Sequence, residues 1–236
     1  MNDELEKNVN EILLNVGKEL VQLFNQNKLT HSMAKEDWEN AILSVATAFS
    51  SVIEARDKNS FGRSKKVAFC SNKIGCYLHL SRDKLINLKI ISYLHNIGNV
   101  AIPDSILFKK GPLNQVEFNT MKIHPLLSAR LAAELPFVGR EVVESIKHHH
   151  EKYDGTGYPD GLSGEDIPLL ARILTLADSV VAMLSRRYYG EKYVFYQVLD
   201  EVKKNSRRHF DPMLAEHIEE IFPTDPLQHF IANRGS

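Results

Sequence analysis

Hydrophobic positions recur with a helical period along nearly the whole chain. In residues 3–25 the apolar side chains fall three or four positions apart and form one stripe: Leu5, Val9, Ile12, Leu13, Val16, Leu20 and Leu23. The same spacing predicts helices that carry Trp38–Ile53, Val67–Leu78 and Leu85–Leu94, and further helices over 115–134, 140–150, 169–184, 192–206 and 212–222. No alternating pattern of useful length predicts a strand. The fold class is therefore expected to be all-α, a helical bundle.

Several residues mark where these helices begin. Ser81 is a plausible N-cap for the helix that follows it. Asn114 followed by Glu117 has the spacing of a capping box, which opens the helix predicted over 115–134. Pro125 lies inside that helix, where it should produce a kink or a restart.

The chain divides into three predicted regions. Residues 1–35 form an N-terminal helical region, residues 36–225 form the main domain, and residues 226–236 form a tail whose last residues look vector-derived. Glycine and proline residues predict loops over 98–113 and over 154–168, and the first of these is expected to pass close to the candidate site described below.

Composition narrows the function classes. The formal net charge of −1 gives no sign of nucleic acid or of an anionic membrane as partner, and no apolar run is long enough to span a bilayer. The N-terminus is not a signal peptide, so we expect a cytoplasmic protein. Cys70 and Cys76 are more plausibly two reduced core thiols than one disulfide.

Histidines gather in one central stretch of the chain. Of ten histidines, five lie between positions 95 and 150: His95, His124, His148, His149 and His150. Apolar neighbours indicate that His95 and His124 face the interior, and the helix that ends in the histidine run directs at least one imidazole inward. For His148 we favour an ordinary surface position. A lone buried histidine is usually a hydrogen-bonded core residue, whereas several together indicate a metal site.

Asp178 lies in a helix that is apolar nearly all round, ARILTLADSVVAML. A bare carboxylate is costly to bury, so this one is expected to be paired or bound to metal. An ion pair with Arg172 or Arg186 is the alternative, although neither lies four residues away. Imidazole nitrogens with one carboxylate suit zinc, iron, manganese or cobalt. The residues alone therefore predict a metal site in a bundle and leave the substrate open.

Three stretches together resemble a known family. LHNIGNVAIPDSIL, GPLNQVEFNTMKIHP and HHHEKYDGTGYPDGLSGEDIPLLARILTLADSVVAM are similar, in this order, to the HD-GYP group of the HD-domain phosphohydrolase superfamily. Gly157, Tyr158 and Pro159 form the signature tripeptide, and the likeness covers about residues 40–215. The resemblance implies an HD-GYP-type helical bundle with two or three metal ions, usually iron or manganese, that hydrolyses cyclic dinucleotides, chiefly cyclic di-GMP.

The match to the family's site is incomplete. Five ligand positions are intact, namely His95, His124, His149, His150 and Asp178. Asn96 stands where the family has the aspartate that bridges two metals, and Arg63 stands where it has an upstream histidine ligand. Asn99 replaces a lysine thought to contact the substrate phosphate, and Asn59 replaces the extra glutamate of the three-metal subgroup.

These substitutions should abolish one of the two metal positions. An ionised aspartate gives each metal an anionic oxygen, whereas an amide offers one neutral oxygen. A guanidinium does not deprotonate, so Arg63 cannot be a ligand. The position that would use residues 63 and 96 keeps only His95 and Asp178. We expect it to be empty, with Arg63 paired to Asp178.

The other metal position keeps His124, His149 and His150, as in a mononuclear three-histidine site. We therefore predict at most one divalent transition metal per chain (iron, manganese or zinc), or none. Hydrolysis of cyclic di-GMP should be lost or strongly slowed.

Two hypotheses of function remain. The favoured one is a degenerate HD-GYP protein in cyclic-dinucleotide signalling, in which Arg63, Arg186 and Arg187 replace the metals' charge against a phosphate. The loop at Gly157–Pro159, exposed as its composition suggests, is then a candidate contact for a protein such as a diguanylate cyclase domain; a purely structural loop is an equal alternative. The competing hypothesis is an active metal-dependent phosphodiesterase with an altered site.

The amphipathic helix over residues 3–25 adds a further element. It either mediates a homodimer, belongs to a lost sensory domain, or folds back on the bundle. We favour the last interpretation slightly.

Overall fold

The computed structural model describes residues 35–56, 62–185 and 194–228. Within these ranges the regular structure is helical, with two isolated β-bridges and no strand, so the all-α prediction is confirmed there. The helix predicted over 3–25 lies outside the described residues. In the described part of the chain, no helix combines the length and apolar character needed to cross a membrane.

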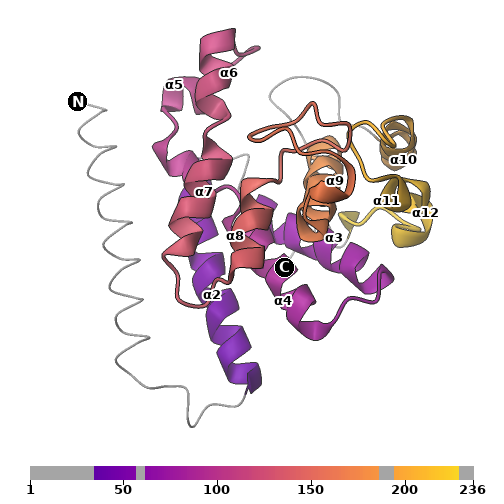
Figure 1. Cartoon of the computed structure of the whole chain (residues 1–236), viewed down its shortest axis with the longest axis horizontal. Helices are drawn as coiled ribbons and strands as arrows, with labels where there is room; N and C mark the ends of the chain where they lie inside the picture. The colour runs from indigo at the N-terminus through magenta and orange to yellow at the C-terminus, as the bar shows by residue number, and fades with distance from the viewer. Residues whose placement is uncertain (1–34, 57–61, 186–193, 229–236) are drawn as a thin grey trace.

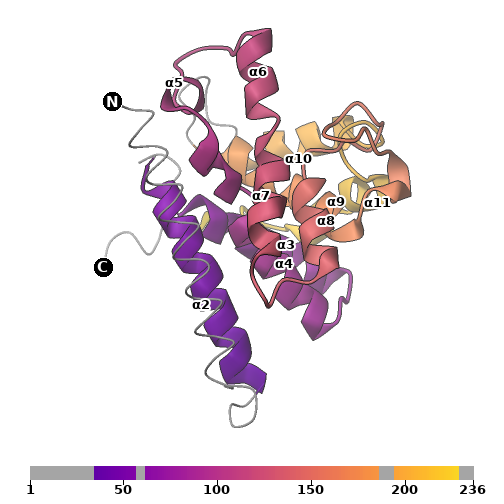
Figure 2. The ribbon, with the colours of Figure 1, turned by 60° about the vertical axis from the view of Figure 1, so that its left-hand side comes forward.

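The helices follow one another as α2 (Lys35–Glu54), α3 (Arg63–Tyr77), α4 (Arg82–Leu94), α5 (Asp104–Leu107), α6 (Gln115–Met121), α7 (His124–Ala133), α8 (Arg140–Lys147), α9 (Leu169–Leu184), α10 (Phe195–Lys204), α11 (Pro212–Glu216) and α12 (Ile218–Ile221). Two 3-10 segments, η2 (Ile97–Ala101) and η3 (Gly164–Asp166), lie in the loops. In Figure 1, α2 and α7 lie on one side of the molecule and α10 to α12 on the other, with α9 between them. Figures 1 and 2 both show α5 and α6 standing out from the bundle.

Helix α9 forms the centre of the hydrophobic core. It contacts α3, α4, α8 and α10, and its side chains are buried on all these sides: Leu170, Ile173, Leu174, Leu176, Val180, Val181 and Leu184. Each such side chain contributes about 1.5–3 kcal/mol on burial. This packing leaves α9 little freedom to move, so Asp178, which lies on it, has a fixed position.

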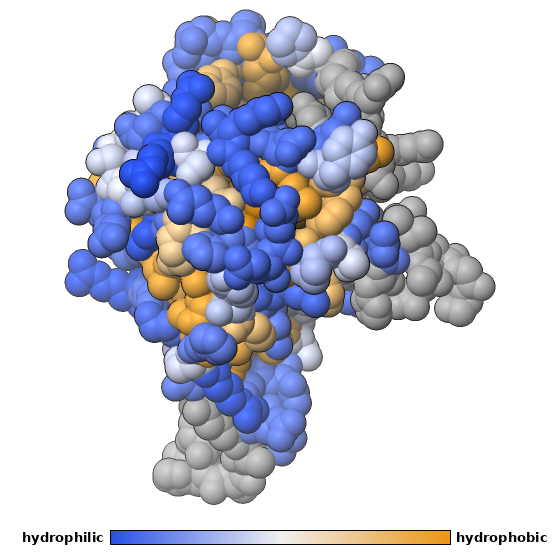
Figure 3. All heavy atoms as spheres, turned by 90° about the vertical axis from the view of Figure 1, so that its right-hand side faces the viewer, coloured by the Kyte–Doolittle hydropathy of each residue, from blue (hydrophilic) through white to orange (hydrophobic). Residues whose placement is uncertain are grey.

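The surface that carries α10 to α12 is mainly hydrophilic, with hydrophobic side chains grouped between the polar ones (Figure 3). The exposed apolar residues of this region are Val194, Tyr196 and Met213. Val194 and Tyr196 lie at the start of α10 and Met213 lies in α11, and a few exposed apolar residues are ordinary for a globular protein.

The predicted helix starts are confirmed. The Ser81 side chain accepts a hydrogen bond from the backbone N–H of Lys84 at 3.4 Å. Asn114 and Glu117 form both hydrogen bonds of a capping box at the start of α6. Pro125 lies in the first turn of α7, so the predicted helix over 115–134 restarts rather than bends.

The predicted helix over 140–150 is too long at its end. Helix α8 stops at Lys147, and the histidine run forms the turn beyond it. The ring nitrogen Nδ1 of His149 lies 2.7 Å from the carbonyl oxygen of Ile146 and takes the place that the backbone N–H of His150 would fill in a longer helix. The histidine side chains thus help to end the helix that leads to them.

Three smaller predictions need correction. The segment 98–113 is not wholly a loop, because it contains part of η2 and all of α5. The helix predicted over 212–222 is broken at His217, where α11 ends and α12 begins. Both cysteines are free, but only Cys70 is a core thiol, since Cys76 is exposed.

Candidate metal centre

Two segments bring three histidines together. His124 opens α7, and His149 and His150 lie in the turn after α8, which packs against α7. One ligand nitrogen from each ring lies within 4.8 Å of the others. His124 and His149 are buried, and His150 is half-buried. The structure therefore groups the three residues that were expected to hold one metal; we call them the histidine cluster.

Backbone carbonyls fix the tautomer of two of these rings. Nδ1 of His124 lies 2.8 Å from the carbonyl oxygen of Met121, and Nδ1 of His149 lies 2.7 Å from that of Ile146. Since a carbonyl oxygen only accepts, both Nδ1 atoms carry a hydrogen, and each neutral ring keeps a free lone pair on Nε2. These two Nε2 atoms lie 3.4 Å apart. Two facing lone pairs repel, and a cation between them removes the repulsion.

Burial keeps the histidine cluster neutral at pH 7. It lowers the pKa of His124 to about 4 and the pKa of His150 to about 3. Burial and the neighbouring histidines also lower the pKa of His149 well below its ordinary value. Neutral imidazole is the form that binds a metal, so no proton has to be displaced at neutral pH. Donor type, tautomer and charge all fit a site with three nitrogen ligands.

Asn96 occupies the free nitrogen of His95. Nδ1 of His95 donates to the carbonyl oxygen of Ser92 at 2.9 Å, which leaves the lone pair on Nε2. The amide Nδ2 of Asn96 donates to that Nε2 at 2.8 Å. An ionised aspartate has no hydrogen to give. The side chain at position 96 therefore takes up a ligand nitrogen instead of sharing a metal with it.

Arg63 binds the carboxylate of Asp178, which belongs to the same metal position as His95. Its Nη2 donates to Oδ1 of Asp178 at 2.6 Å, and that Oδ1 lies 3.7 Å from Nε2 of His95. Burial alone raises the pKa of Asp178, but the Arg63 guanidinium outweighs it and holds the pKa well below its ordinary value. The expected Arg63–Asp178 pair is confirmed. The alternative partner, Arg172, pairs with Asp211 instead.

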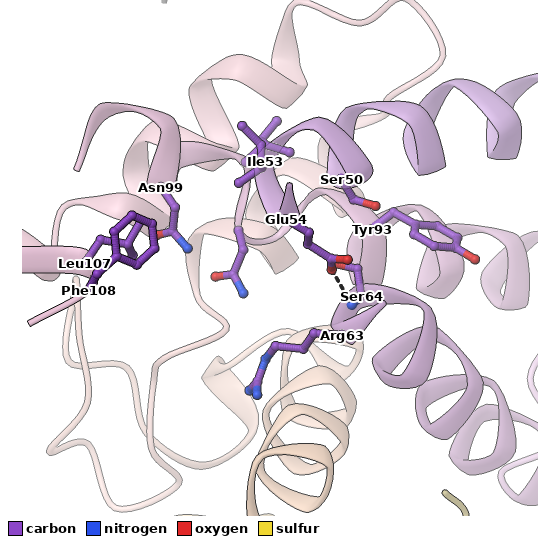
Figure 4. A pocket seen from close by; sticks show the side chains of 11 residues that line it. Ser50, Ile53, Glu54, Arg63, Ser64, Tyr93, Asn99, Leu107 and Phe108 are labelled. Atoms are coloured by element: carbon purple, nitrogen blue, oxygen red, sulfur yellow. Dashed lines mark hydrogen bonds between the residues drawn. The ribbon is translucent and has the colours of Figure 1, made fainter. Parts of the chain in front are cut away.

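The start of α3 directs Arg63 into the site. The carboxylate of Glu54 accepts from the backbone N–H of Gly62 at 2.7 Å and of Ser64 at 2.6 Å, one residue on each side of Arg63. Gly62 has a φ of 73°, a left-handed conformation that suits glycine. The Arg63 side chain extends away from Glu54 and toward α9 (Figure 4). Glu54 thus fixes the backbone from which the guanidinium reaches Asp178.

Asn99 lines a separate small cavity of about 60 Å³, together with Arg63, Asn96, Tyr93 and Phe108 (Figure 4). The histidine cluster does not line this cavity. Among the described residues, Oδ1 of Asn99 is buried without a hydrogen-bond partner. Position 99 therefore brings no cation to the site.

A larger pocket of about 340 Å³ opens beside the histidine cluster. His149, His150, Arg63 and Asp178 line one part of it. The rest is lined from α9 by Thr175, Ser179, Ala182 and Met183, and from α10 and the turn after it by Glu201, Asn205, His209 and Phe210. An anion in this pocket would meet both the guanidinium and any metal held by the cluster.

The tripeptide Gly157-Tyr158-Pro159 lies against the cluster. The Tyr158 ring stacks on the His150 ring, with centroids 5.0 Å apart and an angle of 26° between the planes. A Cβ on Gly157 would lie 2.3 Å from the backbone nitrogen of Lys152, so only glycine fits. All three residues of the tripeptide are half-buried, and the expectation that they are exposed is wrong.

Two buried polar residues anchor this loop, and this role was predicted for neither of them. Oε1 of Glu151 accepts from the backbone N–H of Asp160 at 2.7 Å and of Gly161 at 3.0 Å. Nε2 of His148 lies 3.0 Å from Oδ2 of Asp160, and its Nδ1 lies 2.8 Å from the carbonyl oxygen of Glu144. His148 is therefore buried, not on the surface as expected, because it ties the loop to α8.

Three residues of the predicted site lie outside the described residues. They are Asn59, Arg186 and Arg187. The phosphate-binding role of the two arginines stays a prediction.

A protein-family model described as HD domain matches residues 47–214 of the chain. A cyclic di-GMP phosphodiesterase response regulator from Xanthomonas campestris is 36% identical over 166 residues, which are 70% of this chain and 44% of that protein. A 3′3′-cGAMP-specific phosphodiesterase 2 from Vibrio cholerae is 34% identical over 188 residues, 78% of this chain and 34% of that protein. The chain thus spans less than half the length of these curated relatives.

Solved structures show the same fold. A cyclic GMP-AMP phosphodiesterase from V. cholerae aligns with a TM-score of 0.57 at 22% identity, over 79% of this chain and 49% of that one. An HDG"Y"P protein from Bdellovibrio bacteriovorus aligns with a TM-score of 0.59 at 20% identity, over 79% of this chain and 60% of that one.

Proposed function

Because this chain belongs to the HD domain family and, within it, to the HD-GYP group, we propose that it is a cyclic-dinucleotide-binding signalling module whose phosphodiesterase activity is lost or strongly reduced. The observation that carries the proposal is the ion pair of Arg63 with Asp178. The hydrogen bond from Asn96 to His95 acts in the same direction. Together these contacts engage both ligand side chains that remain at one of the family's two metal positions.

The substitutions at positions 63 and 96 impair phosphodiester cleavage more than they impair the binding of a phosphate. Two-metal phosphodiester cleavage uses ions about 3.5–4 Å apart, which clamp the attacking and the leaving oxygen. Arg63 brings positive charge to the place of one ion and can pair with a phosphate, but a guanidinium does not generate a hydroxide nucleophile. The site therefore keeps an attraction for phosphate while it loses part of the apparatus that cleaves it.

We infer one divalent transition metal (iron, manganese or zinc) at His124, His149 and His150. When bound, such an ion supplies positive charge that polarises a phosphate oxygen. The chain itself orients the ligands, because the carbonyls of Met121 and Ile146 hold two of the rings through Nδ1.

The large pocket supports a nucleotide ligand. Arg63 on its wall spends one nitrogen, Nη2, on Asp178 and has further N–H donors that could turn to a phosphate. The relatives named as cyclic di-GMP and 3′3′-cGAMP phosphodiesterases support a cyclic dinucleotide as the class of ligand.

The competing function is an active phosphodiesterase with an altered metal site. It is favoured by the intact histidine cluster and by the activity in the relatives' names. Arg63 would then have to leave Asp178 when a second ion binds, or one ion would have to suffice.

Calorimetry with cyclic di-GMP, beside a hydrolysis assay on the same metal-loaded sample, separates these functions. Binding without turnover supports the binding module. Turnover that disappears in His149→Ala supports the enzyme. If cyclic di-GMP does not bind at all, the role passes to a protein partner, such as a diguanylate cyclase domain, at exposed loop residues beside the tripeptide, including Asp154, Thr156 and Asp160.

A further inference from the structure

One wall of the large pocket is built by α10 and the turn after it, away from the metal-ligand positions in sequence. His209 and Phe210 lie in that turn with their rings stacked, centroids 4.4 Å apart and planes 11° apart. Phe210 is buried, whereas His209 is half-buried, and both line the pocket. Phe210 covers one face of the imidazole, so a further flat ring could stack only on the other face. Among the described residues, the His209 ring has no hydrogen-bond partner that would hold it for another purpose.

Asn205 holds this wall together. Its carbonyl oxygen accepts from the backbone N–H of His209 at 3.0 Å and of Phe210 at 3.1 Å. Its side-chain Nδ2 donates to Oε1 of Glu201 at 2.9 Å. Arg207, inside the turn, has a φ of 63°, which few residues other than glycine adopt. The turn is therefore a specific structure that sets the His209 ring and the Glu201 carboxylate in fixed relation.

The Glu201 carboxylate keeps acceptor capacity on both oxygens. Oε1 accepts one hydrogen bond from Asn205 and has a second lone pair, and the structure describes no partner for Oε2 within the described ranges. An ionised carboxylate only accepts hydrogen bonds. It suits the edge of guanine that carries the N1–H and the N2 amino group as adjacent donors. The matching edge of adenine presents an unprotonated N1, which repels a carboxylate.

We propose that a purine base of the bound nucleotide stacks on His209 and that Glu201 selects guanine over adenine. This inference rests on the proposed function, because it requires a cyclic dinucleotide in the pocket. The phosphate would then lie toward Arg63 and His150, which line the same pocket. Met183 and Phe210 supply apolar surface for the base between the two polar walls.

Base selection is tested by calorimetry with cyclic di-GMP and cyclic di-AMP. The wild-type protein should bind cyclic di-GMP at least about tenfold more tightly, since a site built to pair with N–H groups rejects a ring that lacks them. Glu201→Gln should weaken cyclic di-GMP binding by about tenfold or more and leave cyclic di-AMP binding equal or tighter. Glu216→Gln, on an exposed carboxylate of α11, is the matched control and should change neither affinity.

Stacking is tested by a pair of variants at the same position. His209→Ala should weaken both dinucleotides by roughly five- to hundredfold, the range for loss of one stacked base. His209→Phe keeps a flat ring and should restore binding. Restoration by phenylalanine separates stacking from any role of the imidazole nitrogens.

The outcomes distinguish the base-reading role of Glu201 from the proposed binding of a cyclic dinucleotide. Tight binding of cyclic di-GMP with an unchanged preference in Glu201→Gln would overturn the base-reading role and leave the proposed function standing. Equal wild-type affinity for the two dinucleotides would overturn it too, even if the variant failed to fold. If neither dinucleotide binds the wild-type protein, both the inference and the nucleotide-binding function fail.

Discussion

Asn96 and an aspartate have nearly the same shape, but they treat His95 in opposite ways. The tautomer set by the Ser92 carbonyl leaves a lone pair on Nε2 of His95, and the amide of Asn96 donates to it at 2.8 Å. Arg63 likewise donates to Asp178, through its positively charged guanidinium. The two substitutions thus complement each other: each gives a hydrogen-bond donor to one side chain that would otherwise need a metal as its partner.

The double variant Arg63→His with Asn96→Asp should restore a second metal position. It returns a ligand, a bridging carboxylate and a free Asp178 together, so hydrolysis of cyclic di-GMP should rise at least about a hundredfold over wild type in the presence of manganese or iron. Initial rates of product formation measure this. Asn96→Asp alone is the control, and full activity in that single variant would mean that Arg63 does not block the site.

The neutral histidines predict a loss of stability in acid for the metal-free protein. The folded-state pKa of His124, about 4, lies below its ordinary value of 6.5, so the unfolded chain binds more protons below pH 6.5. Stability is complete above that pH and falls as the pH drops toward 4. The loss from His124 alone should be roughly 2–3 kcal/mol, at about 1.4 kcal/mol per pKa unit. Urea unfolding at pH 7.5 and 4.5 measures it, and His124→Gln should show a smaller difference.

Sequence reasoning found the residues whose chemistry is unusual for their surroundings. Histidines and an aspartate in apolar helices are conspicuous, and the Arg63–Asp178 pair followed from opposite charges at adjoining positions of the family's site. Glu151 and His148 were missed because their partners are groups of a loop about ten residues away, whose course no local pattern gives. The available signal was Glu151, an acidic residue directly after the histidine run.

Among the helices, the sequence predicts where a helix begins better than where it ends. A side-chain cap such as Asn114 with Glu117 is written in four consecutive positions, so the sequence reveals it. The end of α8 depends on histidine rings that donate to the helix's own carbonyls, and one of these rings, that of His148, also contacts Asp160 in the loop that follows. A prediction from periodicity alone therefore makes this helix three residues too long at its C-terminal end.

The contact of η2 with α7 depends on Gly98. A Cβ at this position would lie 2.3 Å from the carbonyl oxygen of His124 and 2.6 Å from the backbone nitrogen of Ser128. Gly98→Ala should therefore push α7 away and destabilise the protein by about 2 kcal/mol or more, which lowers the melting temperature by roughly 4–8 °C. Gly139→Ala is the control, since a Cβ there meets nothing within 4 Å and the φ of −80° suits alanine. Equal melting temperatures in the two variants would show that the close approach is not needed.

For the whole molecule, the helical period predicted the fold class, while the assembly of the site needed the structure. Ligand positions from the end of α4, from α7, from the turn after α8 and from α9 meet because α9 packs in the centre of the bundle. The predicted division into residues 1–35, 36–225 and 226–236 and the dimer alternative for the first region stay predictions, because the described residues begin at 35.

The number of metal ions bound per chain shows whether one of the two metal positions has been lost. Protein prepared without a histidine tag and dialysed with iron, manganese or zinc in excess should be measured by elemental analysis against the protein concentration. We expect one ion per chain at most, and close to none in His149→Ala, because the histidine cluster is the one group among the described residues that keeps its metal ligands free. Two stoichiometric ions per chain in the wild-type protein would contradict it.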